Sequence, residues 1–316
     1  MKLWDMSDMY KLINEYPRQF ERGFRMAEFL QIPDDITEVV IIAVSYNAAV
    51  AMIIKNLFAH NFKVPVTIYP EEGWPRQIGP KTLCIAVSLC GHRVEVLSAV
   101  KTAYTANAKI VVVTTGSELE VFAKERNLPI VLMDKELPEW KFRMGQGLIL
   151  SVIIQLLINA RVLSIDVRQK ILQAATAIEA LYLPKLGQKL ANDLTGLTVL
   201  IYSSFNYAGL ARLVKALINI LWQTPSFTGS FIDLQYLEVY GFTHGKGYTK
   251  QFLLFLQDKT DDELIQATIK KLEHQLSAGK AKQFTLDLPG ANHIEKTLAS
   301  IMLFYWTIYW LLNKSK

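Results

Sequence analysis

The sequence predicts an α/β protein made of two domains in tandem, each a three-layer domain with a parallel sheet. Short apolar runs rich in β-branched residues alternate with helical stretches, which is typical of parallel strands covered on both faces. This alternation pauses after a long apolar helix and restarts at Leu197, so we expect domains at 1–163 and 164–316. A length of 316 residues suits two domains of about 100–200 residues each.

In the first half, apolar residues recur every three or four positions from 7 to 30 behind a cap signal at Ser7 and Asp8, which predicts an opening helix. Five short apolar runs then predict the strands of the first sheet, with a helix at 47–60 after the first of them. These runs are 38–44, 64–69, 82–88, 109–114 and 128–133. A long apolar helix at 144–163 closes the domain.

The second half begins with a helical segment at 167–182 and a loop at 184–196. Strands are expected at 197–202, 234–240, 251–257 and 283–288, and helices at 207–222 and 261–277. The apolar run at 298–312 is shorter than the roughly 18 residues that a membrane span needs. A helix that is apolar on all sides must be covered, so we expect a buried or dimer-interface helix rather than a membrane partner.

Composition excludes several classes of protein. A hydrophobic content of 51% with 20% charged residues is that of a well-cored globular chain, not a disordered one. The net charge of +5 comes from scattered basic residues, so we expect no nucleic-acid partner. Two cysteines, Cys84 and Cys90, cannot frame a disulfide scaffold, and the opening residues lack the apolar core of a signal peptide. We therefore expect a cytoplasmic protein.

Polar residues follow two of the predicted strands at the edge where ligands bind in parallel sheets. Ser45 and Asn47 come after the first strand, at the start of a helix whose dipole favours an anion. A second turn, after the third strand, holds Ser88 and Gly91. Hydroxyls and N–H groups at such a helix start replace the water around a phosphate, so the two turns are the candidate anion site. A plain strand-to-helix turn without a ligand is the alternative.

The turn from Ser88 to Arg93, followed by Glu95, resembles the Ser-x-Ser-Gly-x-Thr loop of the sugar isomerase (SIS) domain family, whose members hold sugar phosphates. Ser88, Gly91 and Glu95 match that pattern. Cys90 stands in place of the second hydroxyl and Arg93 in place of the threonine, so charge would hold the anion instead of a hydroxyl. His92 completes the candidate phosphate-binding turn.

The tandem plan resembles the two-domain SIS isomerases of the bifunctional phosphoglucose/phosphomannose type over nearly the whole chain. The segment 140–148 (WKFRMGQGL) is similar to the one that carries a substrate-facing arginine, which would be Arg143. The segment 211–220 (ARLVKALINI) supplies Lys215 as a further substrate-binding candidate. The resemblance implies a catalytic glutamate and a histidine at positions where this chain has Ile220 and Tyr236.

Two other constellations supply candidate catalytic residues. Many SIS proteins carry a His-Gly pair after a strand, and His244-Gly245 would be that pair here, with Glu238 nearby. The segment 289–296 resembles the family's Gly-x-x-x-Leu-Glu segment and offers His293 and Glu295. A capped helix start at Asn292 is the competing structural interpretation of this second segment.

Two functions remain open at this stage. The first is a sugar phosphate isomerase with a rearranged site, because aldose–ketose interconversion needs an acid, a base and groups that stabilise an enediolate. The second is a non-catalytic sugar phosphate-binding or regulatory protein. No G-x-G-x-x-G motif and no metal-ligand spacing occur, so no cofactor or metal is expected. We also expect a homodimer, because the apolar C-terminal helix exposes more apolar surface than one sheet face hides.

Overall fold

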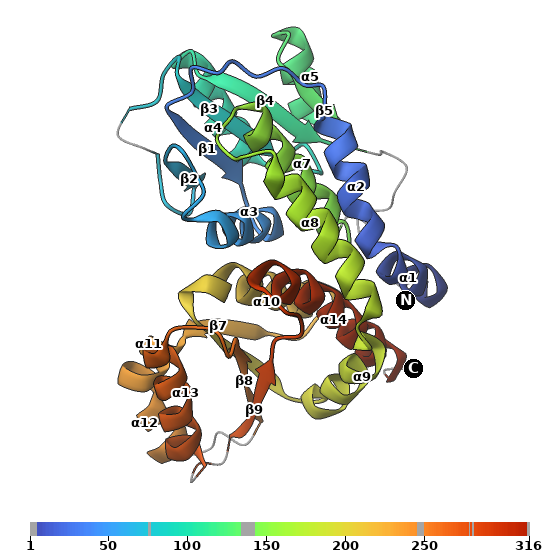
Figure 1. Ribbon diagram of the computed structural model, residues 1–316, viewed down its shortest axis with the longest axis vertical. Coiled ribbons are helices and arrows are strands. Elements are labelled where there is room, and N and C mark those ends of the chain that lie inside the picture. The colour runs from blue at the N-terminus through green and yellow to red at the C-terminus, as the bar shows by residue number, and fades with distance from the viewer. Residues whose placement is uncertain are drawn as a thin grey trace. The chain divides into compact units, whose positions relative to one another are not determined.

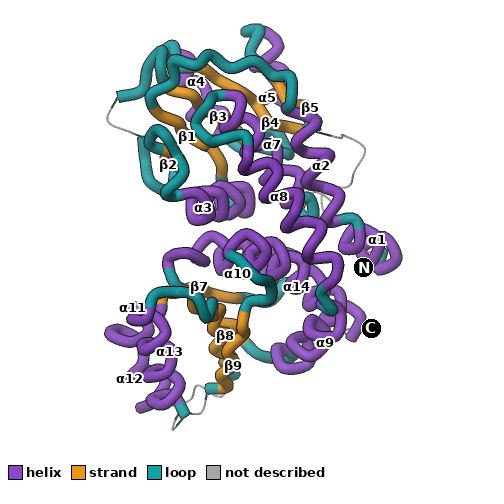
Figure 2. The backbone as a smooth tube through the Cα atoms, in the orientation of Figure 1, coloured by secondary structure: helices purple, strands orange, loops and turns teal. Residues whose placement is uncertain are grey.

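The computed structural model describes residues 5–74, 77–133, 143–244, 250–277, 279 and 281–314. The chain separates into two compact units, one formed by Asn14–Thr176 and the other by Met1–Ile13 together with Ala177–Lys316. Each unit has a parallel sheet with helices on both faces (Figures 1 and 2). The predicted class, α/β with two parallel sheets, is confirmed.

The first unit has a five-stranded sheet in the order β2-β1-β3-β4-β5, with every neighbouring pair parallel. The strands are β1 (Glu38–Ala43), β2 (Val66–Tyr69), β3 (Thr82–Val87), β4 (Lys109–Thr114) and β5 (Ile130–Leu132). All residues of β3 are buried, and β1 is buried after its first residue. Such near-continuous apolar strands are expected where helices cover both faces.

Among the described residues, helices α2 (Tyr16–Ala27), α3 (Tyr46–Phe58), α4 (Val94–Thr105), α5 (Ser117–Glu125) and α7 (Gln146–Asn159) cover this sheet. α4 and α5 bury one face of the sheet in a core that includes Val40, Cys84 and Val112. α3 and α7 pack together, and α2 packs along α7, which gives the second helical layer (Figure 1). α8 (Asp166–Ala177) then leads out of the unit.

The second unit has a four-stranded parallel sheet in the order β7-β6-β8-β9. Its strands are β6 (Thr198–Ser203), β7 (Ser226–Ser230), β8 (Gln251–Gln257) and β9 (Lys282–Asp287). One face packs on α11 (Phe231–Asp233), the π-helical turn η3 (Leu234–Glu238), α12 (Val239–His244) and α13 (Glu263–Leu276). α9 (Leu183–Leu194), α10 (Ala208–Leu221) and α14 (His293–Lys314) pack together as another layer.

α14, the apolar C-terminal helix, is buried by its own chain. It packs along α9 and α10, and the Trp306 ring meets the Tyr10 ring of α1 (Met6–Asn14) edge-on, with centroids 5.3 Å apart. Its apolar surface therefore does not by itself require a second subunit. Within the described ranges, no helix combines the length and apolarity that crossing a bilayer takes.

Two helical expectations need correction. The opening helix predicted at 7–30 is two helices that meet at Glu15, because Pro17 has no N–H to donate and its ring disfavours a continuous helix. The loop predicted at 184–196 is mostly α9, whose Pro184 lies in the first turn, where proline is well tolerated. Gly187 within α9 leaves room for Trp306 of α14, which explains a glycine in a helix interior.

The strand predicted at 234–240 was wrong. These residues form the η3 turn and the start of α12, where Leu234 and Val239 are buried while Tyr236 and Leu237 are exposed. The strand that pairs with β6 is β7, Ser226–Ser230, whose sequence SFTGS has only one large apolar residue. An edge strand with a partly exposed surface carries little hydrophobic signal, so the sequence pattern missed it.

Candidate functional site

The first sheet has its topological switch point between β1 and β3. The chain leaves β1 towards β2 and leaves β3 towards β4, on opposite sides, and ligands in open α/β sheets bind at the carboxyl ends of such a strand pair. Ala43 and Val87 are register partners at these ends. Ser45 and Ser88, which follow them, therefore lie on neighbouring strands at the same edge.

The turn from Ser88 to Arg93 is held in place by the neighbouring turn after β4. The Ser88 N–H donates to the Val113 carbonyl (3.0 Å), and the Leu119 N–H donates to the Gly91 carbonyl (2.9 Å). Thr115 donates its hydroxyl to the Leu89 carbonyl at 2.5 Å and its N–H to the same oxygen at 3.2 Å. The turn is thus rigid before any ligand arrives.

Gly91 is required for this turn. Its φ of +69° lies in the left-handed region, and its N–H donates to the Ser88 carbonyl at 3.1 Å. A Cβ at this position would collide with the carbonyl oxygen of Gly116. The two turns therefore pack backbone against backbone, which brings the start of α4 close to the start of α5.

Positive φ angles mark the same edge of the first sheet. Most described non-glycine residues with positive φ end helices, but Ser45 (φ +59°) and Ser117 (φ +65°) begin helices α3 and α5 instead. Strained backbone of this kind costs on the order of 1–3 kcal/mol and clusters at functional sites. Three consecutive strand-to-helix turns at this edge, after β1, β3 and β4, thus adopt a left-handed conformation.

The donors at this edge suit an anion. Arg93 is the N-cap of α4, and no described side chain caps the first N–H groups of that helix. Arg93 and His92 are exposed, while Ser88 is buried with its Oγ 3.7 Å from the Cys90 Sγ. His92 is oriented by contact between its Nδ1 and the Cys90 carbonyl at 3.0 Å. The exposed guanidinium and the helix start together favour negative charge.

Asn47 adds an acceptor at the start of α3. Only 5% of its surface is exposed, and its Oδ1 is buried without a hydrogen-bond partner among the described residues. A buried amide oxygen without a donor costs roughly 1–3 kcal/mol, so a ligand hydroxyl at this position would remove a penalty. Of the predicted residues, Ser45, Asn47 and those of the Ser88 turn are placed on neighbouring elements of one edge.

Arg143 lies in the turn before α7, and the part of the 140–148 segment that precedes it is outside the described residues. Its backbone carbonyl accepts from the Gln146 side chain at 2.5 Å. The start of α7 is fixed by Gln19 of α2, which donates to the Met144 carbonyl (2.9 Å) and accepts from the Gly147 N–H (3.2 Å). This buried amide sets the position of the turn that carries Arg143.

The switch point of the second sheet, between β6 and β8, is filled by the protein's own side chains. Asp258 directly follows β8 and is 4% exposed, and Lys296 of α14 is 6% exposed and pairs with its carboxylate. The Tyr207 hydroxyl (2.6 Å) and the Thr260 hydroxyl (2.7 Å) also donate to Asp258. Sequence reasoning did not choose Asp258, although a charged residue directly after a buried strand was the available signal.

The hydrogen bonds to Asp258 outweigh the cost of burying it. Burial alone would raise the pKa of this carboxyl, but the hydrogen bonds from Lys296, Tyr207 and Thr260 lower the pKa to about 2. Asp258 is therefore charged at neutral pH. Burial, and then the hydrogen bond to Asp258, raises the pKa of the Tyr207 hydroxyl far above its ordinary value.

His293 sits beside this cluster at the start of α14. Its ring packs edge-on against Tyr207 with centroids 4.8 Å apart, and its Nε2 is buried without a hydrogen-bond partner among the described residues. Burial lowers the pKa of His293, although Asp258 and Asp261 oppose that shift. His293 is thus a neutral imidazole at pH 7.

The Glu295 side chain forms hydrogen bonds at the start of α14. It accepts from the Ala291 N–H (2.9 Å) and the Asn292 side chain (2.7 Å), while the Asn292 Oδ1 accepts from the Glu295 N–H (3.0 Å). Asn292 thus caps the helix start through the Glu295 N–H, and Glu295 reaches back to the preceding residues, which agrees with the structural interpretation of the segment. His293 and Glu295 are therefore close in the chain, but their side chains have separate environments.

The other predicted residues of the second unit lie apart from this cluster. Glu238 accepts from the Tyr202 hydroxyl at 2.5 Å, and His244, the last residue of α12, contacts the Thr243 hydroxyl through Nδ1 at 2.8 Å. Gly245 and Lys246 lie outside the described residues. Lys215 is on α10, where its carbonyl accepts from Ser226 at the beginning of β7 (3.2 Å).

Comparisons with known proteins give a family match for part of the chain and a structural likeness for nearly all of it. Residues 185–311 match the family model described as the bacterial phospho-glucose isomerase C-terminal SIS domain. The chain also superposes on solved structures over nearly its whole length. The second unit therefore resembles the C-terminal SIS domain of bacterial phosphoglucose isomerases over residues 185–311, and the whole chain shares its fold with solved structures.

Two curated relatives and two solved structures illustrate the likeness. The chain is 20% identical over 310 residues, 97% of its length and 92% of the relative, to a bifunctional phosphoglucose/phosphomannose isomerase of Aquifex aeolicus (strain VF5). It is 27% identical over 126 residues to the enzyme of that name from Caldicellulosiruptor bescii, but this match spans only 39% of the chain and 37% of the relative.

Both solved structures share the fold at 14% identity. The C-terminal domain of glucosamine-fructose-6-phosphate aminotransferase from Francisella tularensis has a TM-score of 0.71, with 97% of this chain and 96% of that chain covered. Tagatose-6-phosphate ketose/aldose isomerase from Escherichia coli has a TM-score of 0.66, with 97% and 92% covered.

Proposed function

We propose that the protein binds a sugar phosphate at the carboxyl edge of the first sheet, with the phosphate on the turn from Ser88 to Arg93. The observation that carries this proposal is the uncapped start of α4 beside a rigid turn with Gly91 at φ +69° and an exposed Arg93. N–H groups at such a helix start favour a phosphate without further binding groups. The buried Oδ1 of Asn47 would accept from a sugar hydroxyl.

The proposed activity is aldose–ketose isomerisation of that sugar phosphate, by this protein as an isomerase or as a diverged relative of one. The names of the Aquifex and Escherichia coli relatives support the reaction class. Ile220 and Tyr236 cannot transfer protons as a glutamate and a histidine would. His293, neutral and with a buried Nε2, and His244 are the two candidates for proton transfer.

A panel of hexose and pentose phosphates, measured by thermal shift beside the matching free sugars, tests the binding proposal. A ligand that binds only the native state raises the melting temperature, so at least one sugar phosphate should do so more than its free sugar. Arg93→Ala should reduce the shift, whereas Lys101→Ala, which removes an exposed charge farther along α4, should not. No shift with any sugar phosphate would remove the proposal.

Isomerase assays on the compounds that bind then separate the enzyme from a non-catalytic binding protein. If the protein is an isomerase, losing the proton-transfer histidine should lower kcat far more than it changes KM. His244→Ala and His293→Ala decide between the two candidates. Bound sugar phosphate with no turnover in the wild type would favour the non-catalytic, regulatory alternative.

We also propose a homodimer, although α14 is covered within one chain. Exposed apolar side chains on the α11–α12 segment, Ile232, Tyr236 and Tyr240, offer an alternative apolar surface for a second copy. Sedimentation at micromolar concentration should show a dimer. A monomer throughout that range would contradict this part of the proposal.

A further inference from the structure

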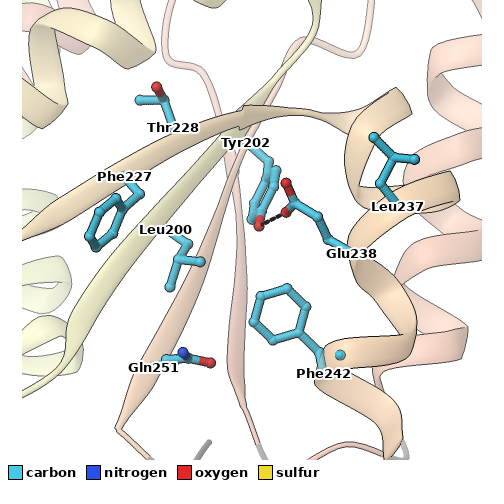
Figure 3. Close-up of a pocket in the computed structure, with 9 residues that line it drawn as sticks. Leu200, Tyr202, Phe227, Thr228, Leu237, Glu238, Phe242 and Gln251 are labelled. Carbon is cyan, nitrogen blue, oxygen red and sulfur yellow. Dashed lines mark hydrogen bonds between the residues drawn. The ribbon is translucent and has the colours of Figure 1, made fainter. Parts of the chain in front are cut away.

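A cavity of about 380 Å³ lies in the second unit, between the sheet and the η3–α12 segment (Figure 3). Leu200 and Tyr202 of β6 and Gln251 of β8 line it from the sheet, and Glu238 and Phe242 line it from the helical side. The exposed side chains of Phe227 and Leu237 lie at its border. Its size falls within the range of small-molecule pockets, which is roughly 300–1,000 Å³.

Two acceptor groups in this cavity, the Glu238 carboxylate and the Gln251 amide oxygen, bear on its ligand. The Tyr202 hydroxyl donates its proton to Glu238 at 2.5 Å, as the dashed line in Figure 3 shows. Burial, and then the contact with Glu238, raises the pKa of Tyr202, so the phenol stays protonated and Glu238 acts as the acceptor. The Gln251 Oε1 is buried and accepts no hydrogen bond from the described residues.

Among the described residues that line the cavity, no cation balances the charge of Glu238. None of the nine lining residues is a lysine, arginine or histidine, while Glu238 is acidic. Among the described residues, Glu238 has no ion-pair partner within 4 Å. The carboxylate would repel a phosphate, so this cavity differs in kind from the anion site of the first unit.

Aromatic rings form part of the cavity lining. Tyr202 and Phe242 flank Glu238, and Phe227 faces the cavity from β7 (Figure 3). Aromatic faces attract cations through their quadrupole, and the effect adds to a nearby carboxylate in a partly desolvated site. Aromatic walls, one carboxylate and an unpaired carbonyl oxygen form a combination that selects an N–H donor with positive charge and an apolar body.

We propose that this cavity binds a small organic amine, with its ammonium group on Glu238 and its apolar body between Leu200, Phe227 and Phe242. The ligand class is a protonated primary amine on an aromatic or aliphatic body. This site lies in a different unit from the proposed phosphate turn and has the opposite charge preference. It therefore goes beyond the proposed function, and its failure would leave the sugar phosphate proposal untouched.

The test is titration calorimetry of the full chain at pH 7.5 with three probes of similar shape: 2-phenylethylamine, 2-phenylethanol and 3-phenylpropionate. The amine should bind saturably, the neutral alcohol at least about tenfold more weakly, and the acid not measurably. The net charge of +5 disfavours non-specific attraction of an amine, so amine-selective binding reports a specific site.

Glu238→Gln should weaken amine binding by at least about tenfold, to the level of the alcohol. Glu263→Gln is the matched control, because it removes an exposed carboxylate of α13 that does not line the cavity. If Glu238→Gln fails to fold by circular dichroism, Phe227→Ala, which removes an exposed ring from the cavity lining, should weaken the amine several-fold. No amine binding up to about 10 mM, equal binding of the acid, or an unchanged affinity in the cavity variants would overturn the proposal.

Discussion

At the residue scale, the buried Lys296 side chain of the second unit forms an ion pair with the Asp258 carboxylate. Changing Lys296 to Met would leave Asp258 as a buried carboxylate without its cation, which costs about 3–5 kcal/mol in comparable cases. Urea unfolding should show a loss of that size. The matched control is Lys259→Met, whose exposed pair with Asp287 should cost less than about 1 kcal/mol. Similar losses in both variants would contradict the assigned role of Lys296.

Asp258 also makes stability depend on acid pH. Its pKa is about 2 in the folded protein, against about 3.9 in an unfolded chain. A depressed folded pKa means that the stabilisation is complete above about pH 4 and is lost as the pH falls towards 2. Urea unfolding between pH 5.5 and 2.5 should therefore show a steeper loss in the wild type than in Asp258→Asn. Parallel pH profiles would show that this carboxyl is not coupled to folding.

At the element scale, the turn after β3 depends on Gly91. Gly91→Ala adds left-handed strain and a collision with Gly116, and should destabilise the protein by more than about 2 kcal/mol. Gly196→Ala is the matched control, because Gly196 also has a positive φ (+77°) but open space around its Cβ position. It should cost only about 1 kcal/mol. Thermal or urea unfolding of both variants measures the difference, and equal losses would contradict the packed turn.

Elements with strong apolar runs were predictable from sequence, and those with weak signals were not. β1, β3 and β4 are buried on both faces, so their β-branched runs fall where the strands are. β7 has only Phe227 as a large apolar residue, so the sequence pattern did not predict a strand there. The 234–240 run has apolar residues for a strand, but burial of Leu234 and Val239, five positions apart, suits the π-helical turn.

At the scale of the whole molecule, the two units have similar sheets, but different residues occupy their topological switch points. In the first unit the edge between β1 and β3 is built from glycine and serine turns with an uncapped helix start. In the second unit the edge between β6 and β8 is occupied by the Asp258–Lys296 pair and its hydrogen bonds. The first edge offers the Ser88 turn and the start of α4 to an anion, which is why the phosphate proposal belongs there.

The candidate site was predictable from sequence only where its residues are adjacent in the chain. Residues adjacent in sequence, such as those from Ser88 to Arg93, can be recognised as one turn from a linear pattern. The hydrogen bond from Thr115 to the Leu89 carbonyl joins positions 26 residues apart, and the Asp258–Lys296 pair joins positions 38 residues apart. A single sequence does not reveal such contacts. Because residues 234–240 were predicted as a strand, the sequence did not indicate the pocket around Glu238.

The most direct test of the central claim is the dissociation constant of a sugar phosphate for the intact protein and for Ser88→Ala, measured by titration calorimetry. The ligand is the sugar phosphate that gives the largest thermal shift, and the matching free sugar is titrated beside it. We expect binding at least about tenfold tighter for the phosphate than for the free sugar, and a clear weakening in Ser88→Ala. Equal affinity for the free sugar, or an unchanged dissociation constant in Ser88→Ala, would contradict a phosphate site on this turn.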